Sequence, residues 1–449
     1  MHTFDYKQFF TSELQSLRDR GAYRKFREVV RHTDSFPEID VVHNGENKRV
    51  TVWCSNDYLG MGHCPLLISE AKKAEGDLGV GAGGTRNISG THKDIVTLEK
   101  TFADVYGKES ALVFTSGYVA NQTAIATLAS RIPNLHIFSD SLNHDSIIQG
   151  IRLSRASKSI FRHNDLSHLR ELLEKTPRET PKLIIFESVY SMEGDISDIE
   201  GTIELAEEFG ALTFIDETHA VGLYGPKGAG VAEQRGLLNR ISIIQGSMGK
   251  GYGVVGGFIA GDASLIDFVR SFGNGFIFTT SLPPSVARAA TYSVNYLASS
   301  SKEREIIWSN SVFFKEQLTK RALPFLPGES HIVPLIIGNA KKCTQVTEEL
   351  FNRFSIYAQP INHPTVPEGT ERLRLTATAR HSEEQILKLV DALDILWSEF
   401  SLPRLESKSE VISLSNSIER ERAEVLDRIK LANKKPSGFN IEQSEATIN

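Results

Sequence analysis

The sequence has little cysteine, no long hydrophobic run and no excess of positive charge. Its three cysteines, Cys54, Cys64 and Cys343, are scattered and form no CxxC pair, so we expect neither disulfides nor a zinc site. No apolar run approaches the roughly 18 to 20 residues that span a bilayer. The formal net charge of -6 argues against nucleic acid and anionic membranes as partners. These absences favour a small-molecule substrate, and a reducing cytoplasm is the expected location.

What the 449 residues do contain is a regular alternation of short apolar runs with amphipathic stretches. This alternation is typical of βα units and predicts an α/β fold with a mostly parallel sheet. The clearest strands start at Ala111, His136, Lys182, Ala211 and Ile241. The helical pattern that ends before Gly210 predicts a glycine C-cap there.

The chain is long enough for two domains, and its patterns change at three places. A long helical stretch and the strand-like pieces "SHIVPLIIG", "IYAQPI" and "RLRLTATA" follow the βα region and predict a smaller α+β domain. We therefore expect an N-terminal helix and strand segment over 1–55, a large α/β domain over 56–295, the α+β domain over 296–400, and a charged tail over 401–449 that is either disordered or a single helix.

Lys250 lies in the glycine-rich stretch "IIQGSMGKGYGVVGG" and could bind phosphate, form a covalent imine or have no chemical role. A phosphate loop requires G-x-x-x-x-G-K-[ST], but Ile244 replaces the first glycine and Gly251 follows the lysine. A dinucleotide-binding G-x-G-x-x-G would open a helix after the first strand, whereas this stretch comes after several strands. The imine interpretation remains, and it needs an anion pocket and a carboxylate.

Both companions are available in the sequence. Asp216 ends the predicted strand "LTFID", at the sheet edge where α/β proteins bind ligands. A helix cap is an equally good interpretation of Asp216 alone, but His219 three residues later favours a site. Ser116 and Gly117 precede a predicted helix start at Tyr118, where backbone N–H groups can bind a phosphate.

The ordered set of motifs extends over about residues 21–381 and resembles the α-oxoamine synthases, which are PLP-dependent fold type I enzymes of the aspartate aminotransferase-like architecture. The motifs are "CSNDYLGM", "GGTRNISGT", "NHDSII", "ESVYSMEGD", "IDETHAVGLYGPKGAG", "GSMGKGYGVVGG", "FTTSLPP", "SHIVP" and "QPINHPTVPEGTERLRLT". Within this family the sequence is most similar to members that condense glycine with succinyl-CoA to give 5-aminolevulinate, CoA and CO2, the first step of tetrapyrrole and haem biosynthesis. The resemblance implies pyridoxal 5'-phosphate as cofactor, no metal, and a homodimer with active sites at the subunit interface.

The resemblance also implies the roles of the cofactor residues. Lys250 is expected to bond covalently to the cofactor and to remove a proton from glycine, Asp216 to pair with the pyridine nitrogen, and His144 to stack on the ring. Ser191 and His219 are expected to contact the phenolic oxygen. For each histidine the alternative is a buried structural side chain. The phosphate is expected to bind Gly117, Tyr118 and Ser247, with Thr279, Thr280 and Tyr58 reaching the cofactor from the neighbouring subunit.

The same resemblance implies a set of substrate-binding residues. Arg374 is expected to bind the glycine carboxylate, although Arg372 lies on the same strand face and periodicity alone does not separate them. Arg24, with Thr85, is expected to bind the distal carboxylate of succinyl-CoA; the alternative for Arg24 is an exposed position in a basic N-terminal helix. The remaining expected substrate contacts are Asn56, Asn87, Ser139, Lys158 and Thr365.

Some positions depart from the family pattern. Ser247 replaces threonine, Thr218 replaces valine, and Gly251 replaces alanine. These changes leave every proposed catalytic group in place. They keep open a related synthase with another acyl-CoA and a paralogue in secondary metabolism. A non-catalytic protein that keeps the fold would not need Lys250, Asp216, His219 and Arg374 together.

Overall fold

The computed structural model describes residues 4–43, 45–405, 414–416 and 418–423. The chain divides into two compact units. Among the described residues, the smaller unit contains 4–43, 45–55, Met192–Gly194 and those from Ile306 to 423, and the larger contains Asn56–Ser191 and Asp195–Glu305. The N-terminal segment therefore packs with the C-terminal part of the chain.

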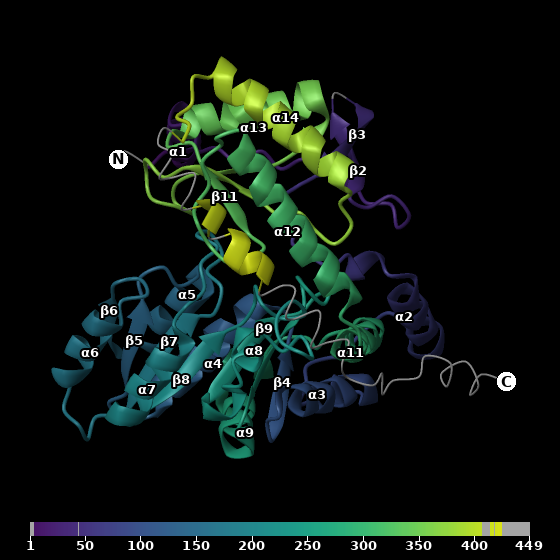
Figure 1. Cartoon of the computed structure of the whole chain (residues 1–449). Helices are drawn as coiled ribbons and strands as arrows, with labels where there is room; N and C mark the ends of the chain where they lie inside the picture. Colours follow the sequence, from purple (N-terminus) through teal and green to yellow (C-terminus); the bar gives the residue numbers. More distant parts are fainter. Residues whose placement is uncertain (1–3, 44, 406–413, 417, 424–449) are drawn as a thin grey trace. The chain divides into compact units, whose positions relative to one another are not determined.

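A seven-stranded sheet forms the centre of the larger unit, with the strand order β4-β10-β9-β8-β7-β5-β6 (Figure 1). The pairs from β9 to β6 are all parallel, and only β10 runs antiparallel to its neighbours β4 and β9. This confirms the predicted mostly parallel sheet. The strands are β4 (Ser110–Phe114), β5 (His136–Asp140), β6 (Ser157–Phe161), β7 (Lys182–Glu187), β8 (Ala211–Asp216), β9 (Ile243–Ser247) and β10 (Gly257–Gly261).

The sequence patterns identified five of these strands and missed β6 and β10. β6 is an edge strand with only Phe161 buried, so it lacks an apolar run. β10 is fully buried but begins and ends with glycine, residues that are typical of turns. Strand β9 begins at Ile243, two residues after the predicted start.

Helices cover both faces of this sheet. On one face α4 and α5 pack their alanine and isoleucine side chains against β4, β5 and β7, in a core that includes Ala124, Ile125 and Ile147. On the other face α3 contributes Phe102, whose ring stacks on Phe258 of β10 at 3.9 Å between centroids. The helices of this unit are α2 (Pro65–Leu78), α3 (Lys93–Tyr106), α4 (Gly117–Arg131), α5 (Asp145–Ser154), α6 (Leu166–Glu174), α7 (Ile199–Phe209), α8 (Val231–Gln234), α9 (Ala263–Phe272), α10 (Asn274–Ile277) and α11 (Pro284–Ser299), with 3-10 turns η1 (Met61–His63) and η2 (Leu238–Arg240).

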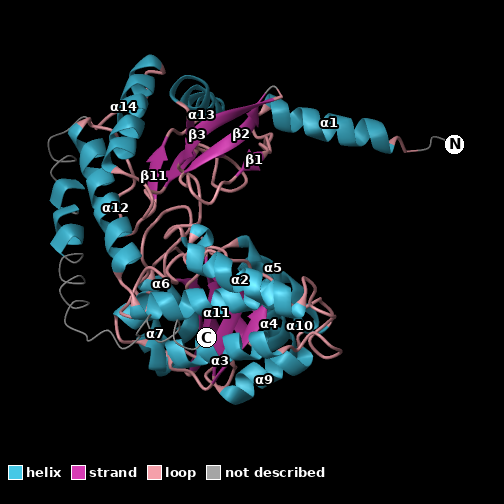
Figure 2. Cartoon of the chain, turned by 90° about the vertical axis from the view of Figure 1, so that its right-hand side faces the viewer, coloured by secondary structure: helices cyan, strands magenta, loops and turns pink. Residues whose placement is uncertain are grey.

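The smaller unit combines two sheets with four helices. One sheet has the order β1-β2-β3-β12 and the other β11-β14-β13. Figure 2 shows α1 projecting from the strands of this unit, and none of its side chains is buried. The elements are α1 (Tyr6–Asp19), β1 (Val29–Val30), β2 (Glu38–His43), β3 (Glu46–Val52), α12 (Lys302–Lys320), β11 (Val333–Ile336), α13 (Ala340–Phe354), β12 (Ile356–Tyr357), β13 (Pro360–Ile361), β14 (Arg372–Leu375) and α14 (Glu383–Glu399).

In the described part of the tail, 401–405 is not helical, whereas 414–416 and 418–423 are helical and contact α12. Glu421 is 2% exposed, and its Oε2 accepts a hydrogen bond from Lys315 Nζ at 2.7 Å. The rest of the predicted helical stretch, 424–432, lies outside the described residues. Among the described helices, none has the length and apolar character needed to cross a bilayer.

Candidate active site

The candidate site lies at the edge of the larger unit's sheet where the parallel strands end. β8 ends at Asp216 and β9 at Ser247, and Lys250 follows three residues later. Because parallel strands end at the same edge, residues that are distant in the sequence come together there. Within the described part of the chain, no group of His, Cys, Asp and Glu side chains is arranged to hold a metal ion.

Asp216 is a buried carboxylate that is held in place on both oxygens. It is 3% exposed. Its Oδ2 accepts from Asn121 Nδ2 at 2.7 Å, and its Oδ1 accepts from the backbone N–H of Thr218 at 2.8 Å. No helix begins directly after Asp216, since the next one is α8 (Val231–Gln234), so the alternative interpretation as a helix cap is wrong. The bond to Thr218 instead closes a turn and fixes the position of the carboxylate.

Lys250 and Asp216 act on the same neighbour, His144. Burial is the main reason why the pKa of His144 lies below its usual value; the negative charge of Asp216 raises it and the positive charge of Lys250 lowers it. Both charges therefore lie within electrostatic range of one imidazole. His144 also caps α5, with its Nδ1 at 2.8 Å from Ser146 Oγ. The structure thus brings the predicted amine, carboxylate and stacking ring together.

The start of α4 and the end of β9, which the sequence predicts to bind an anion, lie side by side. Ser116 caps α4, and its Oγ accepts from the N–H of Val119 at 3.1 Å. The helix begins at Gly117, one residue before the predicted start. A Cβ built on Gly117 would lie 2.9 Å from the Cβ of Ser247, so only glycine allows this close approach. Ser247 therefore lies beside the first residue of α4, and the N-terminus of a helix is a place where phosphate groups commonly bind.

The remaining cofactor residues take different positions. Tyr118 is 40% exposed, and its hydroxyl donates to Asp145 at 3.0 Å. Thr280 pairs with Thr85 in an isolated β-bridge, which places "FTTSLPP" beside "GGTRN". Thr279 is half-buried next to it, and Ser191 is half-buried just beyond β7.

Tyr58 departs from its expected position across a subunit interface. It is completely buried in its own chain, and its hydroxyl lies 2.7 Å from Nδ1 of His219 and donates to Asn56 at 3.1 Å. A side chain enclosed in this way cannot reach into a second subunit. Tyr58 instead orients His219 and Asn56 of the same chain. Three of the predicted site residues are therefore in contact.

The predicted substrate-binding residues of the larger unit do not all lie close together. Thr85 Oγ1 donates to Asn87 Oδ1 at 2.7 Å, so these two are neighbours. Lys158 is exposed on the edge strand β6. Ser139 departs from its expected substrate contact: it is 1% exposed, and its hydroxyl accepts from Asn143 Nδ2 at 2.8 Å. It therefore supports the turn after β5.

The smaller unit contains the predicted arginines. Arg24 lies after the end of α1 at Asp19, so it is not helical, but it is exposed as the alternative interpretation expected. Its guanidinium donates to Thr365 Oγ1 at 3.0 Å. Arg372 is committed to Glu193 and the carbonyl of Met192. Burial, together with the charges of Arg374 and Lys315, holds the pKa of His331 well below its usual range.

Sequence reasoning missed several residues that shape the site. Asn121, which fixes Asp216, follows Gly117 by one helical turn in a stretch of small apolar residues, and that unusual polar position is a usable signal. Glu217 directly follows Asp216 and is completely buried; burial raises its pKa to about 7, against hydrogen bonds from Ser188, Ala232 and Val231 that lower it. Glu187 accepts the N–H of His144 at 2.6 Å.

The comparisons with known proteins agree with this arrangement. The family model for aminotransferase class I and II matches residues 48–393. A 5-aminolevulinate synthase from Rhizobium meliloti is 49% identical over 400 residues, which cover 89% of this chain and 99% of that protein. One from Bradyrhizobium diazoefficiens is 48% identical, covering 90% and 99%. The chain belongs to the class I and II aminotransferase family and, within it, to the 5-aminolevulinate synthase family.

Solved structures show the same fold. A serine palmitoyltransferase from S. paucimobilis, with a bound PLP-myriocin aldimine, is 31% identical and superposes with a TM-score of 0.81 over 89% of this chain and 100% of that chain. An 8-amino-7-oxononanoate synthase from Francisella tularensis is 25% identical, with a TM-score of 0.66 over 78% of this chain and 98% of that chain. The predicted fold class is confirmed.

Proposed function

We propose that this protein is a 5-aminolevulinate synthase, which condenses glycine with succinyl-CoA and releases CoA and CO2. The observation that carries the proposal is the joint action of Lys250 and Asp216 on His144 at the sheet edge. This arrangement supplies an amine and a negative charge that both act on one imidazole. Identity of 49% to a 5-aminolevulinate synthase over most of the chain supports the same reaction.

The residues at the sheet edge fit pyridoxal 5'-phosphate. Gly117, at the start of α4, lies beside Ser247, which suits the phosphate, and Thr279 and Thr280 are proposed to complete its site. Asp216 would hold the pyridine nitrogen protonated, and Lys250 would anchor the cofactor. When bound, the cofactor accepts the negative charge left on glycine Cα.

The chain's own groups then carry the proton and orient the reactants. We propose that Lys250 Nζ takes the proton from glycine Cα. A carbon-carbon bond forms between Cα and the thioester carbonyl carbon, and CoA leaves as its thiol with a proton from solvent. The carboxylate of glycine then leaves as CO2, and the electron pair that stays on Cα takes a proton, which Lys250 Nζ would return. His144 would cover one face of the site, and Ser191 and His219 would donate hydrogen bonds to the phenolic oxygen. Tyr58 would fix the ring of His219.

Two arginines of the smaller unit are proposed to bind the substrate carboxylates. Arg372 is already paired with Glu193, which favours Arg374 as the two-pronged partner of the glycine carboxylate. Arg24, beside Thr365, would bind the distal carboxylate of succinyl-CoA. Thr85, Asn87, Asn56 and Lys158 are proposed as further contacts with the acyl-CoA.

The acyl-CoA preference is tested with glycine and a panel of succinyl-, acetyl- and pimeloyl-CoA, measuring CoA release and 5-aminolevulinate. Succinyl-CoA should be the best substrate, and Arg24→Leu should raise its KM by about 10- to 100-fold through loss of a charge-assisted hydrogen bond. Arg20→Leu, at the exposed end of α1, is the matched control. Equal rates with all three thioesters, or indifference to Arg24→Leu, would favour a related synthase with another acyl group.

Cofactor attachment is tested separately by absorption. The purified protein should be yellow with pyridoxal phosphate, and Lys250→Ala should lose the long-wavelength band and the activity. If the protein gains no such absorption band when the cofactor is added, the proposal is refuted. A protein that binds the cofactor but never exchanges a glycine proton would indicate a non-catalytic role.

We further propose a homodimer in the cytoplasm. The segments joined by the Thr85 and Thr280 bridge carry two strongly exposed apolar side chains, Ile88 and Phe278, each 77% exposed. Apolar exposure next to a site favours contact with a second copy. All three cysteines are free, which suits a reducing compartment.

A further inference from the structure

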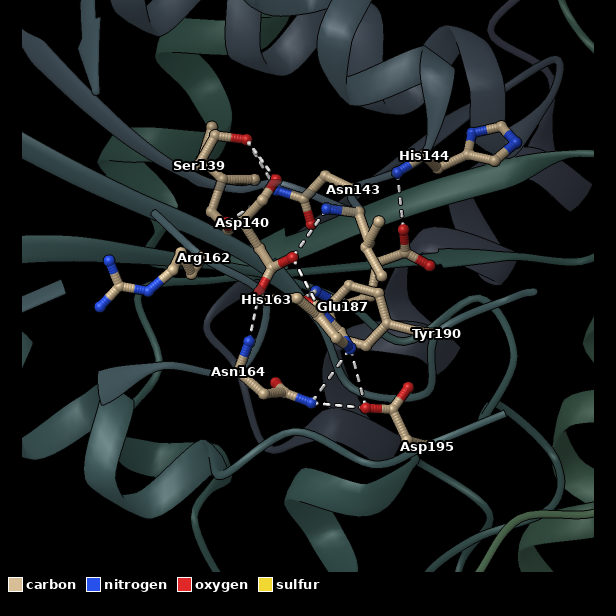
Figure 3. Close-up of polar contacts among 12 residues, drawn as sticks. Ser139, Asp140, Asn143, His144, Arg162, His163, Asn164, Glu187, Tyr190 and Asp195 are labelled. Atoms are coloured by element: carbon tan, nitrogen blue, oxygen red, sulfur yellow. Dashed lines mark hydrogen bonds and ion pairs between the residues drawn. The ribbon is translucent and has the colours of Figure 1, made fainter. Parts of the chain in front are cut away.

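A second polar cluster lies beneath the turn that carries His144, and the proposed reaction does not use it. We call it the His163 clamp and define it as Asp140, His163, Asn164 and Asp195 (Figure 3). His163 Nδ1 lies 3.0 Å from Asp140 Oδ1, and its Nε2 lies 2.9 Å from Asp195 Oδ2. The clamp therefore joins residues that follow three different strands, β5, β6 and β7.

The geometry of the clamp requires a positively charged imidazole. Each ring nitrogen of His163 faces a carboxylate oxygen. A neutral imidazole has one N–H donor, so one carboxylate would face a lone pair; an imidazolium donates to both. The ring of Tyr190 packs edge-on against His163 at 4.4 Å between centroids and excludes water from one side. Asp140, at 2% exposure, thus has a half-buried counter-charge.

Asp140 orders the turn that ends at His144. Its Oδ1 accepts from the N–H of Leu142 at 2.8 Å, and its Oδ2 accepts from the N–H of Asn164 at 2.9 Å. Further along the turn, Asn143 Nδ2 donates to the carbonyl of Ile185 at 2.8 Å. Figure 3 shows the ring of His144 pointing away from the clamp while its backbone N–H bonds to Glu187. Hydrogen bonds on the side of the clamp therefore fix the turn, and the ring of His144 is left to face the candidate active site.

Asp195 orders a second turn, which carries Ser191. The N–H of Tyr190 donates to the carbonyl of Asp195 at 3.0 Å, and Val189 pairs with Ile196 in an isolated bridge. Asn164 Nδ2 donates to Asp195 Oδ2 at 2.6 Å. Ser191 directly follows Tyr190, so the hydrogen bonds that close this turn also fix the backbone position of Ser191.

We propose that His163 is a positioning residue for the reaction, which as a cation ties the turn bearing His144 to the turn bearing Ser191. The proposal rests on the proposed function for the roles of His144 and Ser191. His163 does not touch the reacting atoms. It acts through two aspartates: the carboxylate of Asp140 accepts from the N–H groups of Leu142 and Asn164, and Asp195 closes the second turn with its backbone carbonyl. Loss of the charge of His163 leaves two carboxylates facing each other with no cation between them. Both turns then shift, and the site loses its alignment.

The test compares His163→Gln with His136→Gln. Glutamine keeps a polar side chain of similar length but carries no charge and cannot donate to both carboxylates. His136 is a matched control because it lies at the opposite end of β5 and bonds to Ser159 of β6. In the full chain without cofactor, His163→Gln should speed hydrogen exchange of the amides of Leu142 and Asn164. With cofactor, it should weaken the circular dichroism of the cofactor band and lower kcat by about 100-fold, with little change in the KM for glycine.

The outcomes separate a positioning role from a structural one. A His163→Gln protein with a lower Tm but unchanged exchange, cofactor dichroism and kcat would overturn the proposal. If that variant does not fold, Asp195→Asn decides, because it removes one of the two carboxylates at a partly exposed position and should give the same changes in weaker form; no change would overturn the proposal. The exchange readout needs no turnover, so a wild-type protein that makes no 5-aminolevulinate refutes the proposed function without touching this test.

Discussion

Asp216 shows how a single side chain can serve both structure and chemistry. Its two oxygens are held by Asn121 and by the backbone of Thr218, so it would not need to move when a cationic ring nitrogen arrives. A preorganised charge of this kind costs no reorganisation during the reaction. The neighbouring Glu217 is also buried but bonds to Ser188, Val231 and Ala232, which makes it a support for the next loop.

Asp216→Asn should keep the fold and lose the reaction. The amide can accept only one of the two hydrogen bonds, which costs about 1 kcal/mol of unfolding free energy. The missing charge should lower kcat for 5-aminolevulinate formation by roughly 100- to 1000-fold. Asp198→Asn, at the exposed cap of α7, is the control and should retain full turnover. An Asp216→Asn enzyme within a few-fold of wild-type would rule out a role at the ring nitrogen.

His163 makes a pH-dependent contribution to stability. Burial lowers the pKa of this imidazole, but its hydrogen bonds to Asp140 and Asp195 outweigh burial and raise the pKa to about 10. The neighbouring Arg162 forms an ion pair with Asp165. Because the folded pKa exceeds the ordinary value near 6.5, the stabilisation is complete below that pH and is lost as the pH rises toward 10. The Tm difference between wild-type and His163→Gln should therefore be largest below about pH 6.5 and shrink as the pH rises to 10. A constant difference would contradict a charged His163.

At the scale of elements, close backbone contacts set the proposed anion pocket. The start of α4 touches β10 so closely that a Cβ built on Gly257 would lie 2.4 Å from the backbone nitrogen of Gly117. Backbone atoms cannot swing aside as a side chain can, so the position of α4 depends on this glycine. The pocket is thus determined by the absence of side chains as much as by the hydroxyls around it.

Gly257→Ala should displace the start of α4. We expect a loss of about 1 to 3 kcal/mol of unfolding free energy and weaker binding of pyridoxal phosphate in an absorption titration. Gly76→Ala is the matched control, since Gly76 lies on the exposed side of α2 with nothing near its Cβ position and should gain up to about 1 kcal/mol. Unaltered cofactor affinity in Gly257→Ala would argue against a phosphate site at α4.

The tail segment and α12 form another element-scale contact. Lys315 and Glu421 are only 2% and 3% exposed in their side chains, and Lys315 also donates to the carbonyls of Gly328 and Ser330. Removing one charge of a buried pair leaves the other uncompensated. Glu421→Gln should therefore lower the unfolding free energy by about 3 kcal/mol, measured by denaturant titration. Glu419→Gln, exposed on the same segment, should change nothing; equal effects would show that the pair is unimportant.

At the scale of the whole molecule, each compact unit draws on distant parts of the sequence. In the smaller unit β12 pairs in parallel with β3, so Ile356 lies beside Thr51, and the short segment Met192–Gly194 also belongs there. The proposed site residues are divided in the same way, with Lys250 and Asp216 in the larger unit and Arg24 and Arg374 in the smaller.

The proposed homodimer is tested by mass in solution. Phe278→Lys places a charge on the exposed apolar segment beside Thr280 and should shift the protein from dimer toward monomer in analytical ultracentrifugation, with loss of activity. Leu153→Lys, at an exposed position on α5, should leave the mass unchanged. A monomeric wild-type protein with full activity would refute a shared site.

Local patterns predicted much of the fold and only part of the site. Apolar runs of buried parallel strands marked β4, β5, β7, β8 and β9, but β6 has one buried residue and β10 is bounded by glycine. Family motifs predicted Lys250, Asp216 and His144, which the fold brings together. The position of Tyr58 and the burial of Ser139 could not be predicted, because a motif names a residue without saying what encloses it.

The sequence by itself determined the fold class, the family and the reactive residue types, because burial patterns and ordered motifs are local properties of the chain. Only the tertiary structure decided that Arg372 is occupied by Glu193 and that Asn121 holds Asp216. It also decided that His163 lies between Asp140 and Asp195. Such contacts depend on which strand ends meet at one edge of the sheet, and that is set by the order of strands in space, which differs from their order along the chain.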